Sequence, residues 1–260
     1  MHHLVIVSPT LPSGSQFVER QLGVRLQTGG EHPRMSTHNL LLRLGESLYL
    51  EVIAPDSKAP LPTRARWLGL DGLSEQASPY LAHWVARTEH LDTADGARRD
   101  VVGEIEPMSR EALSWKITIQ PDGHLPLNGA VPSLIDWGES EHPAQSLGDQ
   151  GCELEYLESA LPDPRLLERQ LESIGFIGAV SVLRSERHAL KAYINTPNGL
   201  SHPVTSNLSF ADFMAGQNWA ACDEEILSLN VRHGSFAVTR ARPLSTGTGL
   251  FAKRQPPFLA

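Results

Sequence analysis

The chain of 260 residues is long enough to bury the core of one large domain or of two smaller ones. Its composition, 40% hydrophobic and 20% charged, is typical of a soluble globular protein, and no apolar run approaches the roughly 18 residues of a membrane span. The formal net charge of −8 argues against a nucleic-acid partner, because proteins that bind phosphate backbones usually carry a basic surface.

The cysteines and the N-terminus predict a cytoplasmic protein. Cys152 and Cys222 lie far apart and match no metal or redox spacing, which favours a reduced interior over a disulfide framework. The N-terminus lacks the charged and small-residue flanks of a signal peptide. We therefore expect no association with a membrane.

The first 56 residues predict a unit with the element order βαβββ. Residues 3–7 are expected to form a buried strand, because Val and Ile favour the pleated conformation. Ser13 is expected to cap a short helix that ends near Gly23. The remaining segments are a strand at 24–27, a Gly-Gly loop at 29–33, and the two strands of a hairpin at 38–44 and 48–53.

A second βαβββ unit is predicted between about residues 80 and 140. The pattern His3-Leu4-Val5 recurs eighty positions later as His83-Trp84-Val85, and residues that open a helix follow both copies. A repeated strand–turn–helix segment with a polar residue at the same strand position indicates duplicated modules. The predicted elements are a strand at 81–87, a helix that ends near 99, and strands at 101–107, 113–120 and 131–137.

A partial third module is predicted over residues 146–207. Its segments repeat the same order, with Asp163-Pro164 opening the helix. Residues 208–260 form a C-terminal extension of unknown role, in which a helix at 210–219 and a hairpin across His233-Gly234 are expected. The predicted strands of the third module lie at 152–157, 180–183 and 189–194.

Each of the first two modules places a histidine on its first strand and a carboxylate on its fourth. These residues are His3, Glu51, His83 and Asp136. Neutral imidazole and carboxylate suit a divalent metal such as Zn, Mn, Ni or Fe(II), which could stabilise the oxyanion of a substrate with two adjacent oxygens. Glu51 is also the predicted catalytic residue, because a carboxylate in an apolar strand costs several kcal/mol unless it is paired or metal-bound.

The same residues have structural alternatives. Polar residues such as His3 and His83 often lie at strand ends without binding a ligand. Glu51 could pair with Arg43 on the neighbouring strand. Asp136 lies where a strand leaves the sheet, which is compatible with simple solvent exposure.

Four further residues are predicted to line a substrate pocket. His38 lies one strand from Glu51, and Tyr49 shares a strand face with Glu51. Trp115 and Trp137 could supply surfaces on which a ligand stacks.

Other motifs narrow the function further. His32 and His142 each lie in a Glu-His-Pro tripeptide within a predicted loop, where a solvated surface turn is favoured over a place in the pocket. The sequence contains no Gly-x-Ser-x-Gly, P-loop or Rossmann glycine pattern. A nucleophilic hydrolase and a nucleotide cofactor are therefore not indicated.

Several segments together resemble the glyoxalase-like branch of the vicinal oxygen chelate (VOC) superfamily. The resemblance covers roughly residues 1–200. The segments are specific as a set and weak singly. They are His3–Val7, Gly29-Gly30-Glu31-His32-Pro33, Thr37-His38-Asn39, Tyr49-Leu50-Glu51-Val52-Ile53-Ala54-Pro55-Asp56, Ile135-Asp136-Trp137-Gly138 and Glu141-His142-Pro143.

The resemblance implies an α+β fold, in which paired βαβββ modules form a curved mixed sheet shaped like a cup. A glyoxalase-like domain is then expected at 1–145, with modules at about 1–56 and 80–140. In metal-dependent members the ligands come from the first and fourth strands, which match His3, Glu51, His83 and Asp136. The second module carries Asp136 where glyoxalases and dioxygenases have Glu, and the third module lies outside a two-module arrangement.

Three functions agree with this resemblance. The first is a divalent-metal-dependent lyase, isomerase or dioxygenase that acts on a small oxygenated substrate. The second is a metal-free VOC protein that binds or sequesters a small apolar ligand in the cup. The third is a non-catalytic interaction domain, in which the polar cluster is only a satisfied network. The expected partners are a small molecule and a second copy of the chain in a homodimer.

Overall fold

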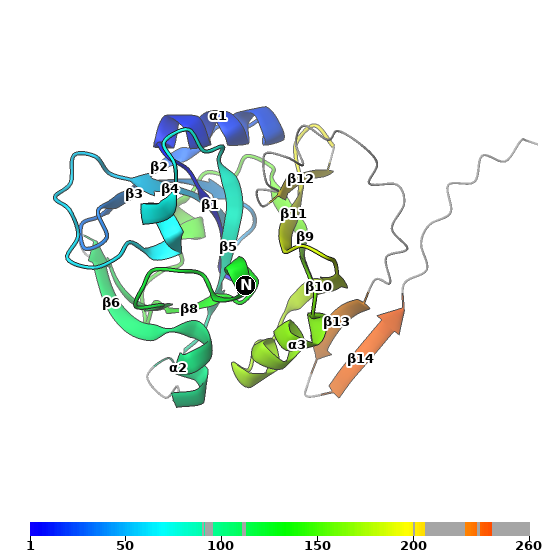
Figure 1. The fold of residues 1–260 in the computed structure, drawn as a ribbon. Coiled ribbons are helices and arrows are strands. Elements are labelled where there is room, and N and C mark those ends of the chain that lie inside the picture. Colours follow the sequence, from blue (N-terminus) through cyan, green and yellow to red (C-terminus); the bar gives the residue numbers. More distant parts are fainter. Residues whose placement is uncertain are drawn as a thin grey trace, which may run out of the picture.

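The structure, a computed structural model, shows two β-sheets packed against each other (Figure 1). No helix in the described part of the chain is long and apolar enough to cross a lipid bilayer. The described residues are 1–89, 91, 96–110, 113–199, 201–205, 227–232 and 235–240.

The first sheet has eight strands in the order β2-β3-β4-β1-β5-β8-β7-β6. In each half the first strand pairs in parallel with the last, β1 with β4 and β5 with β8, while β1 and β5 pair antiparallel at the centre. This arrangement confirms the α+β class and the paired βαβββ modules. The strands are β1 (His3–Val7), β2 (Gln27–His32), β3 (Thr37–Arg43), β4 (Tyr49–Pro55), β5 (Tyr80–Arg87), β6 (Glu104–Arg110), β7 (Leu113–Ile119) and β8 (Ser133–Asp136).

Helix α1 (Leu11–Leu22) begins earlier than the sequence predicted. Thr10, not Ser13, is the N-cap, and its side chain accepts a hydrogen bond from the backbone N–H of Ser13 at 3.3 Å. The prediction of Ser13 was wrong because Pro12 is tolerated in the first helical turn, where its missing N–H has no partner to lose. Gly23 ends the helix in the left-handed conformation, at φ 72°.

Strand β2 corrects the predicted strand at 24–27 and the predicted loop at 29–33. It includes both Gly29 and Gly30, and the pairing register with β3 shifts between Thr28 and Glu31. A Cβ on Gly29 would lie only 2.0 Å from Oδ1 of Asn39. The two glycines therefore allow close approach inside a bulged strand, where sequence reasoning expected a break.

The second module contains the same elements with shifted boundaries. Helix α2 (Gly96–Val102) continues into the predicted strand at 101–107, so β6 begins at Glu104. Gly103 separates the two elements at φ 95°. In the described part of the chain, short 3₁₀ segments connect the strands or follow them, namely η1 (Trp67–Gly72), η3 (Pro126–Gly129) and η4 (Pro143–Ser146).

The second sheet has six strands in the order β12-β11-β9-β10-β13-β14. Its first four strands and α3 follow the predicted order βαβββ, but β9 pairs directly with β10 and β11 instead of with the last strand. Strands β13 and β14 extend this sheet from within the predicted C-terminal extension, whose helix at 210–219 and turn at 233–234 lie outside the described residues. The elements are β9 (Glu153–Leu161), α3 (Pro164–Ser173), β10 (Ala179–Arg184), β11 (Ala189–Asn195), β12 (Ser201–Thr205), β13 (Leu227–Arg232) and β14 (Ser235–Arg240).

Alternation along β1 sends its side chains into two different cores. Leu4 and Ile6 pack with Trp84, Leu157 and other apolar residues in a large core shared by the two sheets. Val5 and Val7 lie on the opposite face, in a second apolar cluster inside the cup. His3 lies on the same face as Val5, so the fold places this histidine in the cup.

Candidate functional site

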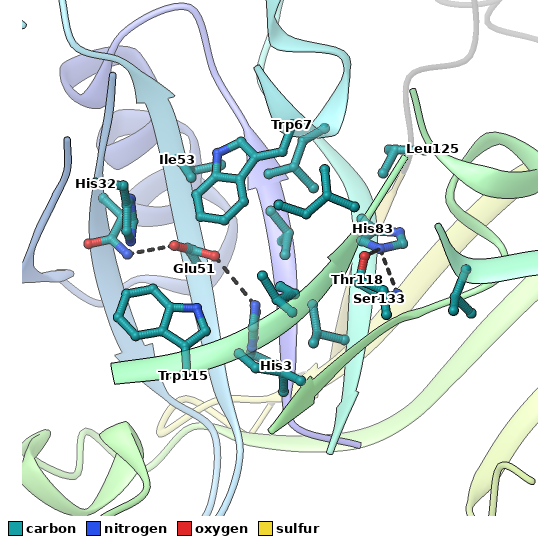
Figure 2. Close-up of a pocket in the computed structure, with 18 of the residues that line it drawn as sticks. His3, His32, Glu51, Ile53, Trp67, His83, Trp115, Thr118, Leu125 and Ser133 are labelled. Carbon is teal, nitrogen blue, oxygen red and sulfur yellow. Dashed lines mark hydrogen bonds and ion pairs between the residues drawn. The ribbon is translucent and has the colours of Figure 1, made fainter. Parts of the chain in front are cut away.

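The concave face of the first sheet encloses a cavity of about 60 Å³ (Figure 2). A space of this size holds a few water molecules or one compact ligand group. Its walls combine a polar set with an apolar and aromatic set. The polar set includes His3, His32, Asn39, Glu51, His83 and Arg110, and the aromatic set includes Tyr49, Trp67, Trp115 and Trp137.

His3 and Glu51 meet because their strands are parallel neighbours. Val5 on β1 is in register with Glu51 on β4, and both side chains point into the cup with His3. Nε2 of His3 lies 3.5 Å from Oε2 of Glu51, and Nδ2 of Asn39 donates a hydrogen bond to Oε1 of Glu51 at 2.5 Å. Figure 2 shows these contacts around the Glu51 carboxyl, which lies between Trp67 and Trp115.

Burial controls the protonation of this pair. It raises the pKa of Glu51 to about 7, although the hydrogen bond from Asn39 and the charge of Arg110 oppose the shift. Burial also lowers the pKa of His3 well below its usual value, and the neighbouring histidines lower it further. Near neutral pH the imidazole of His3 is therefore uncharged, while the carboxyl of Glu51 gains or loses its proton. Because an ion pair would need a protonated imidazole, the contact between His3 and Glu51 is not ionic at this pH.

A second layer of aromatic residues holds His3 in place. Tyr49 stacks on the imidazole ring of His3 with ring centroids 4.7 Å apart and an interplanar angle of 11°. Nδ1 of His3 lies 2.7 Å from Nδ1 of His2, so one of the two nitrogens donates a hydrogen bond to the other. The ring of His142 lies against His2 at a centroid distance of 4.2 Å. The position and tautomer of His3 therefore depend on His2.

His83 lies on the cavity wall but bonds elsewhere. Its Nε2 accepts a hydrogen bond from the backbone N–H of Ser133 at 3.0 Å, and its Nδ1 lies 3.3 Å from the carbonyl oxygen of Gly129. A neutral imidazole in this position donates from Nδ1 to the carbonyl oxygen of Gly129 and accepts at Nε2 from the N–H of Ser133. Figure 2 shows His83 beside Ser133, apart from the His3–Glu51 pair.

Asp136 faces away from the cup. Its neighbour Ile135 lines the cavity, and alternation along β8 puts Asp136 on the other face of the sheet, opposite Lys116 in register. Oδ1 of Asp136 accepts a hydrogen bond from the backbone N–H of Gly138 at 2.8 Å. The side chain thus closes a local turn after the strand.

The donor geometry does not fit the predicted four-ligand metal centre. Of the four residues, only His3 and Glu51 approach each other. The Nε2 lone pair of His83 accepts the hydrogen bond from the backbone N–H of Ser133, and Asp136 lies on the other face of the sheet. Among the described residues, no group of three or more His, Cys, Asp or Glu side chains is placed to hold a metal ion. A stable site for a first-row metal usually needs three or four protein ligands.

The predicted pocket residues have separate outcomes. Tyr49, Trp115 and Trp137 line the cavity. His38 does not line it. Alternation along β3 puts His38 on the same face as Leu42, which belongs to the shared core behind the sheet. The neighbouring Asn39 takes the pocket position, and its amide bonds Glu51.

Sequence reasoning missed several other residues of the site. His32 and His142 were expected in solvated turns, but both are buried, with 5% and 6% of their surface exposed. Trp67 and Arg110 line the cavity from segments that had no predicted role. The repeated Glu-His-Pro tripeptide was a signal for His32 and His142, and a polar residue inside an otherwise apolar strand was a signal for Asn39.

Paired βαβββ modules around an enclosed cavity are the arrangement that the vicinal oxygen chelate resemblance implied. The family model described as glyoxalase-like domain (Glyoxalase_3) matches residues 1–175, so the chain belongs to this family. Among curated proteins, none matches the sequence.

The chain is also similar to several solved structures at low identity. A hypothetical protein from Staphylococcus aureus is 14% identical, with a TM-score of 0.47 over 79% of this chain and 87% of that chain. Methylmalonyl-CoA epimerase in complex with methylmalonyl-CoA and NH4+ is 16% identical, with a TM-score of 0.37 over 55% of this chain and 97% of that one. The same enzyme from Mycobacterium tuberculosis is 14% identical, with a TM-score of 0.33 over 52% and 85%.

Proposed function

We propose that the protein is a glyoxalase-like enzyme of the isomerase or lyase type, in which Glu51 moves a proton on a small oxygenated substrate bound in the cup. The observation that carries this proposal is the position of Glu51, a buried carboxyl in an aromatic cavity with a pKa raised to about 7. A general base is most effective when its pKa lies near the working pH.

The residues around Glu51 have complementary roles in the proposed reaction. Glu51 takes a proton from the carbon next to a carbonyl group, and the electron pair of the broken C–H bond moves onto the carbonyl oxygen. The guanidinium of Arg110 stabilises the resulting oxyanion. Return of the proton to a different atom or face completes an isomerisation. Asn39 holds the carboxylate in one orientation throughout.

The aromatic walls support the same chemistry. Trp67 and Trp115 lie on either side of the carboxyl and exclude water from it (Figure 2). A dry environment raises the basicity of Glu51 and strengthens its electrostatic contacts. The small cavity suits a compact substrate with adjacent oxygen atoms.

Proton exchange tests the proposal without a known substrate. In D2O, 1,2-dicarbonyl and 2-hydroxycarbonyl compounds of about three to six carbons should exchange a C–H proton for deuterium, followed by NMR. Glu51→Gln should slow this exchange by about 100-fold or more, because a positioned general base contributes that much. Glu153→Gln, at an exposed position of β9, is the control. Equal exchange rates in wild type and Glu51→Gln would overturn the proposal.

Chelation addresses the metal dependence expected from the sequence. No step proposed here passes through a metal, because the described donor set does not assemble a centre. We therefore expect dialysis against EDTA to leave the exchange rate within about twofold. Loss of exchange on chelation, with recovery on addition of Zn, Mn, Ni or Fe(II), would instead support the metal-dependent alternative.

A second candidate function is the binding of a small apolar ligand without catalysis. The apolar and aromatic lining of the cavity favours it. Quenching of tryptophan fluorescence by a bound ligand would follow from stacking on Trp115 or Trp67. Ligand binding that is unchanged in Glu51→Gln, without proton exchange in either protein, would favour this candidate over the enzyme.

A further inference from the structure

A second cavity lies between the two sheets, separate from the cup. It has a volume of about 370 Å³. Its walls come from η1, the start of β5 and the η3 region on one side, and from β9 and the start of β11 on the other. We call it the intersheet cleft. Leu68, His124 and Leu125 line both the cleft and the cup, so these three residues form the partition between the two cavities.

The cleft contains a buried hydroxyl without a partner. Ser159 on β9 is 1% exposed, and its Oγ has no hydrogen-bond partner among the described residues. Its neighbours on the same face of the strand, Leu157 and Leu161, belong to the shared apolar core. A hydroxyl at such a position is destabilising unless something hydrogen-bonds it, so it points to a polar group of a ligand or to water.

A second polar atom of the cleft also lacks a hydrogen-bond partner among the described residues. Nδ1 of His188, just before β11, is buried and has no hydrogen-bond partner in the described part of the chain. The backbone of the opposite wall is also unusual, since Leu68, Leu127 and Asn128 adopt left-handed conformations at φ 62°, 43° and 52°. L-residues rarely adopt this conformation, and it is enriched where a structure shapes a binding surface.

The chemistry of the lining indicates the kind of ligand. The walls contain no Asp, Glu, Lys or Arg, and the ionisable side chains of the described lining are Tyr80, His124 and His188, so the lining favours a neutral ligand over a charged one. Leucine and alanine side chains make up most of the remaining surface, from Leu68 and Leu127 on one wall to Ala160 and Leu190 on the other. A ligand that fits this lining is neutral, mostly apolar, and carries one group that can hydrogen-bond.

We propose that the intersheet cleft is a second small-molecule site, which binds a neutral apolar compound with one hydroxyl or carbonyl group between Ser159 and His188. The site uses none of the residues assigned to proton transfer. Binding there can therefore be tested separately from the proposed reaction in the cup.

Binding of 2-naphthol to the full chain tests this proposal. It supplies an apolar body and one hydroxyl, while naphthalene supplies the body alone. We expect saturable 1:1 binding of 2-naphthol by isothermal titration calorimetry. Ser159→Ala should weaken it about fivefold or more, and naphthalene should bind wild type and Ser159→Ala equally, because only the hydrogen bond is lost. His188→Ala, at a half-buried position, should also weaken the binding of 2-naphthol.

Matched variants locate the binding. Ser181→Ala on β10 changes a serine of the same sheet outside the cleft and should have no effect. Trp115→Ala removes a wall of the cup and should leave 2-naphthol affinity unchanged. Absence of saturable binding would mean that the cleft holds only water, and it would overturn the proposal. An unchanged affinity for 2-naphthol in Ser159→Ala would overturn it too. Loss of 2-naphthol binding in Trp115→Ala would place the ligand in the cup and would likewise overturn it. Proton exchange should be unaffected in Ser159→Ala, which separates this test from that of the cup.

Discussion

The ionisation of Glu51 connects the stability of the protein to its proposed activity. Glu51 is only 7% exposed, and among the described residues Asn39 donates the hydrogen bond to its carboxyl. The neighbouring imidazole of His3 is kept neutral by burial. Placing a negative charge on Glu51 weakens the folded state, because the lost hydration is only partly replaced. The same environment gives the carboxyl a pKa suited to proton transfer at neutral pH.

Glu51→Gln should stabilise the protein in a pH-dependent manner. The folded pKa of about 7 exceeds the ordinary value of 4.5, so between these values the unfolded chain releases a proton that the folded chain keeps. The cost of ionising Glu51 to the free energy of unfolding is absent below about pH 4.5, grows between pH 4.5 and 7, and is complete above pH 7. The shift corresponds to at most about 3 kcal/mol.

Urea unfolding of wild type and Glu51→Gln between pH 4.5 and 8 measures this penalty. The stability difference should rise in favour of the variant as pH increases. Glu153→Gln is the control, because it makes the same substitution at an exposed position of β9, outside the cup. A difference between wild type and Glu51→Gln that stays constant with pH would show that the carboxyl is not held protonated by burial.

Asn39→Ala should raise the pKa of Glu51 further. The amide of Asn39 donates to the carboxylate and favours its charged form, so its removal makes ionisation harder. The pH at which proton exchange begins should move upward, and stability at pH 8 should fall by roughly 1.5–3 kcal/mol. His38→Ala, on the opposite face of the same strand, should change neither quantity. An unshifted pH profile in Asn39→Ala would contradict this role.

At the scale of elements, close packing explains where sequence patterns misplaced the structure. Gly14 lies in α1 where a side chain would meet β4: an added Cβ would be 2.3 Å from Cγ1 of Val52. Gly29 and Gly30 in β2 likewise lie where Asn39 and Arg110 leave no room. Gly29 and Gly30, which were predicted as loop residues, therefore mark close contacts inside a regular element.

Gly14→Ala should destabilise the protein although alanine is the better helix former. Overpacking costs about 1–3 kcal/mol and opposes a gain in helix propensity of about 1 kcal/mol. We expect a net loss of up to about 2 kcal/mol in the free energy of unfolding measured in urea. Gln16→Ala, at an exposed position of the same helix, should be neutral or slightly stabilising. A variant Gly14→Ala as stable as wild type would mean that α1 can move away from β4.

At the scale of the whole molecule, the two sheets share one core. Trp84 of the first sheet is fully buried behind the cup, and its ring lies 5.0 Å from that of Phe176, which follows α3. The core also includes Leu157 of the second sheet. The predicted domain at 1–145 therefore packs its convex side against the segment that follows it, and we expect the cup to depend on that contact.

Leu157→Ala should destabilise the cup from a distance. Removal of a fully buried leucine costs about 2–5 kcal/mol. Four of the five tryptophans lie in residues 1–145, so tryptophan fluorescence reports mainly on the first sheet. Its unfolding midpoint in urea should fall in the variant, with a single transition. A fluorescence midpoint identical to that of wild type would show that the two sheets unfold independently.

Several features of this protein could be predicted from the amino-acid sequence alone. The repeat of His3 and His83, the period-2 patterns and the helix signals predict paired βαβββ modules, because local propensity and alternation act within short segments. The same alternation correctly puts Tyr49 and Glu51 on one face of a strand. These features depend on neighbours in sequence and need no knowledge of distant contacts.

Only the tertiary structure decided which side chains meet. His3 reaches Glu51 because β1 pairs in parallel with β4, whereas the nitrogens of His83 are directed to Ser133 and Gly129 by a loop fifty residues away. The choice of Asn39 over His38 depends on which face of β3 lines the cup. Strand register and loop packing are properties of the assembled sheet, and a one-residue change in either moves a side chain to the opposite face.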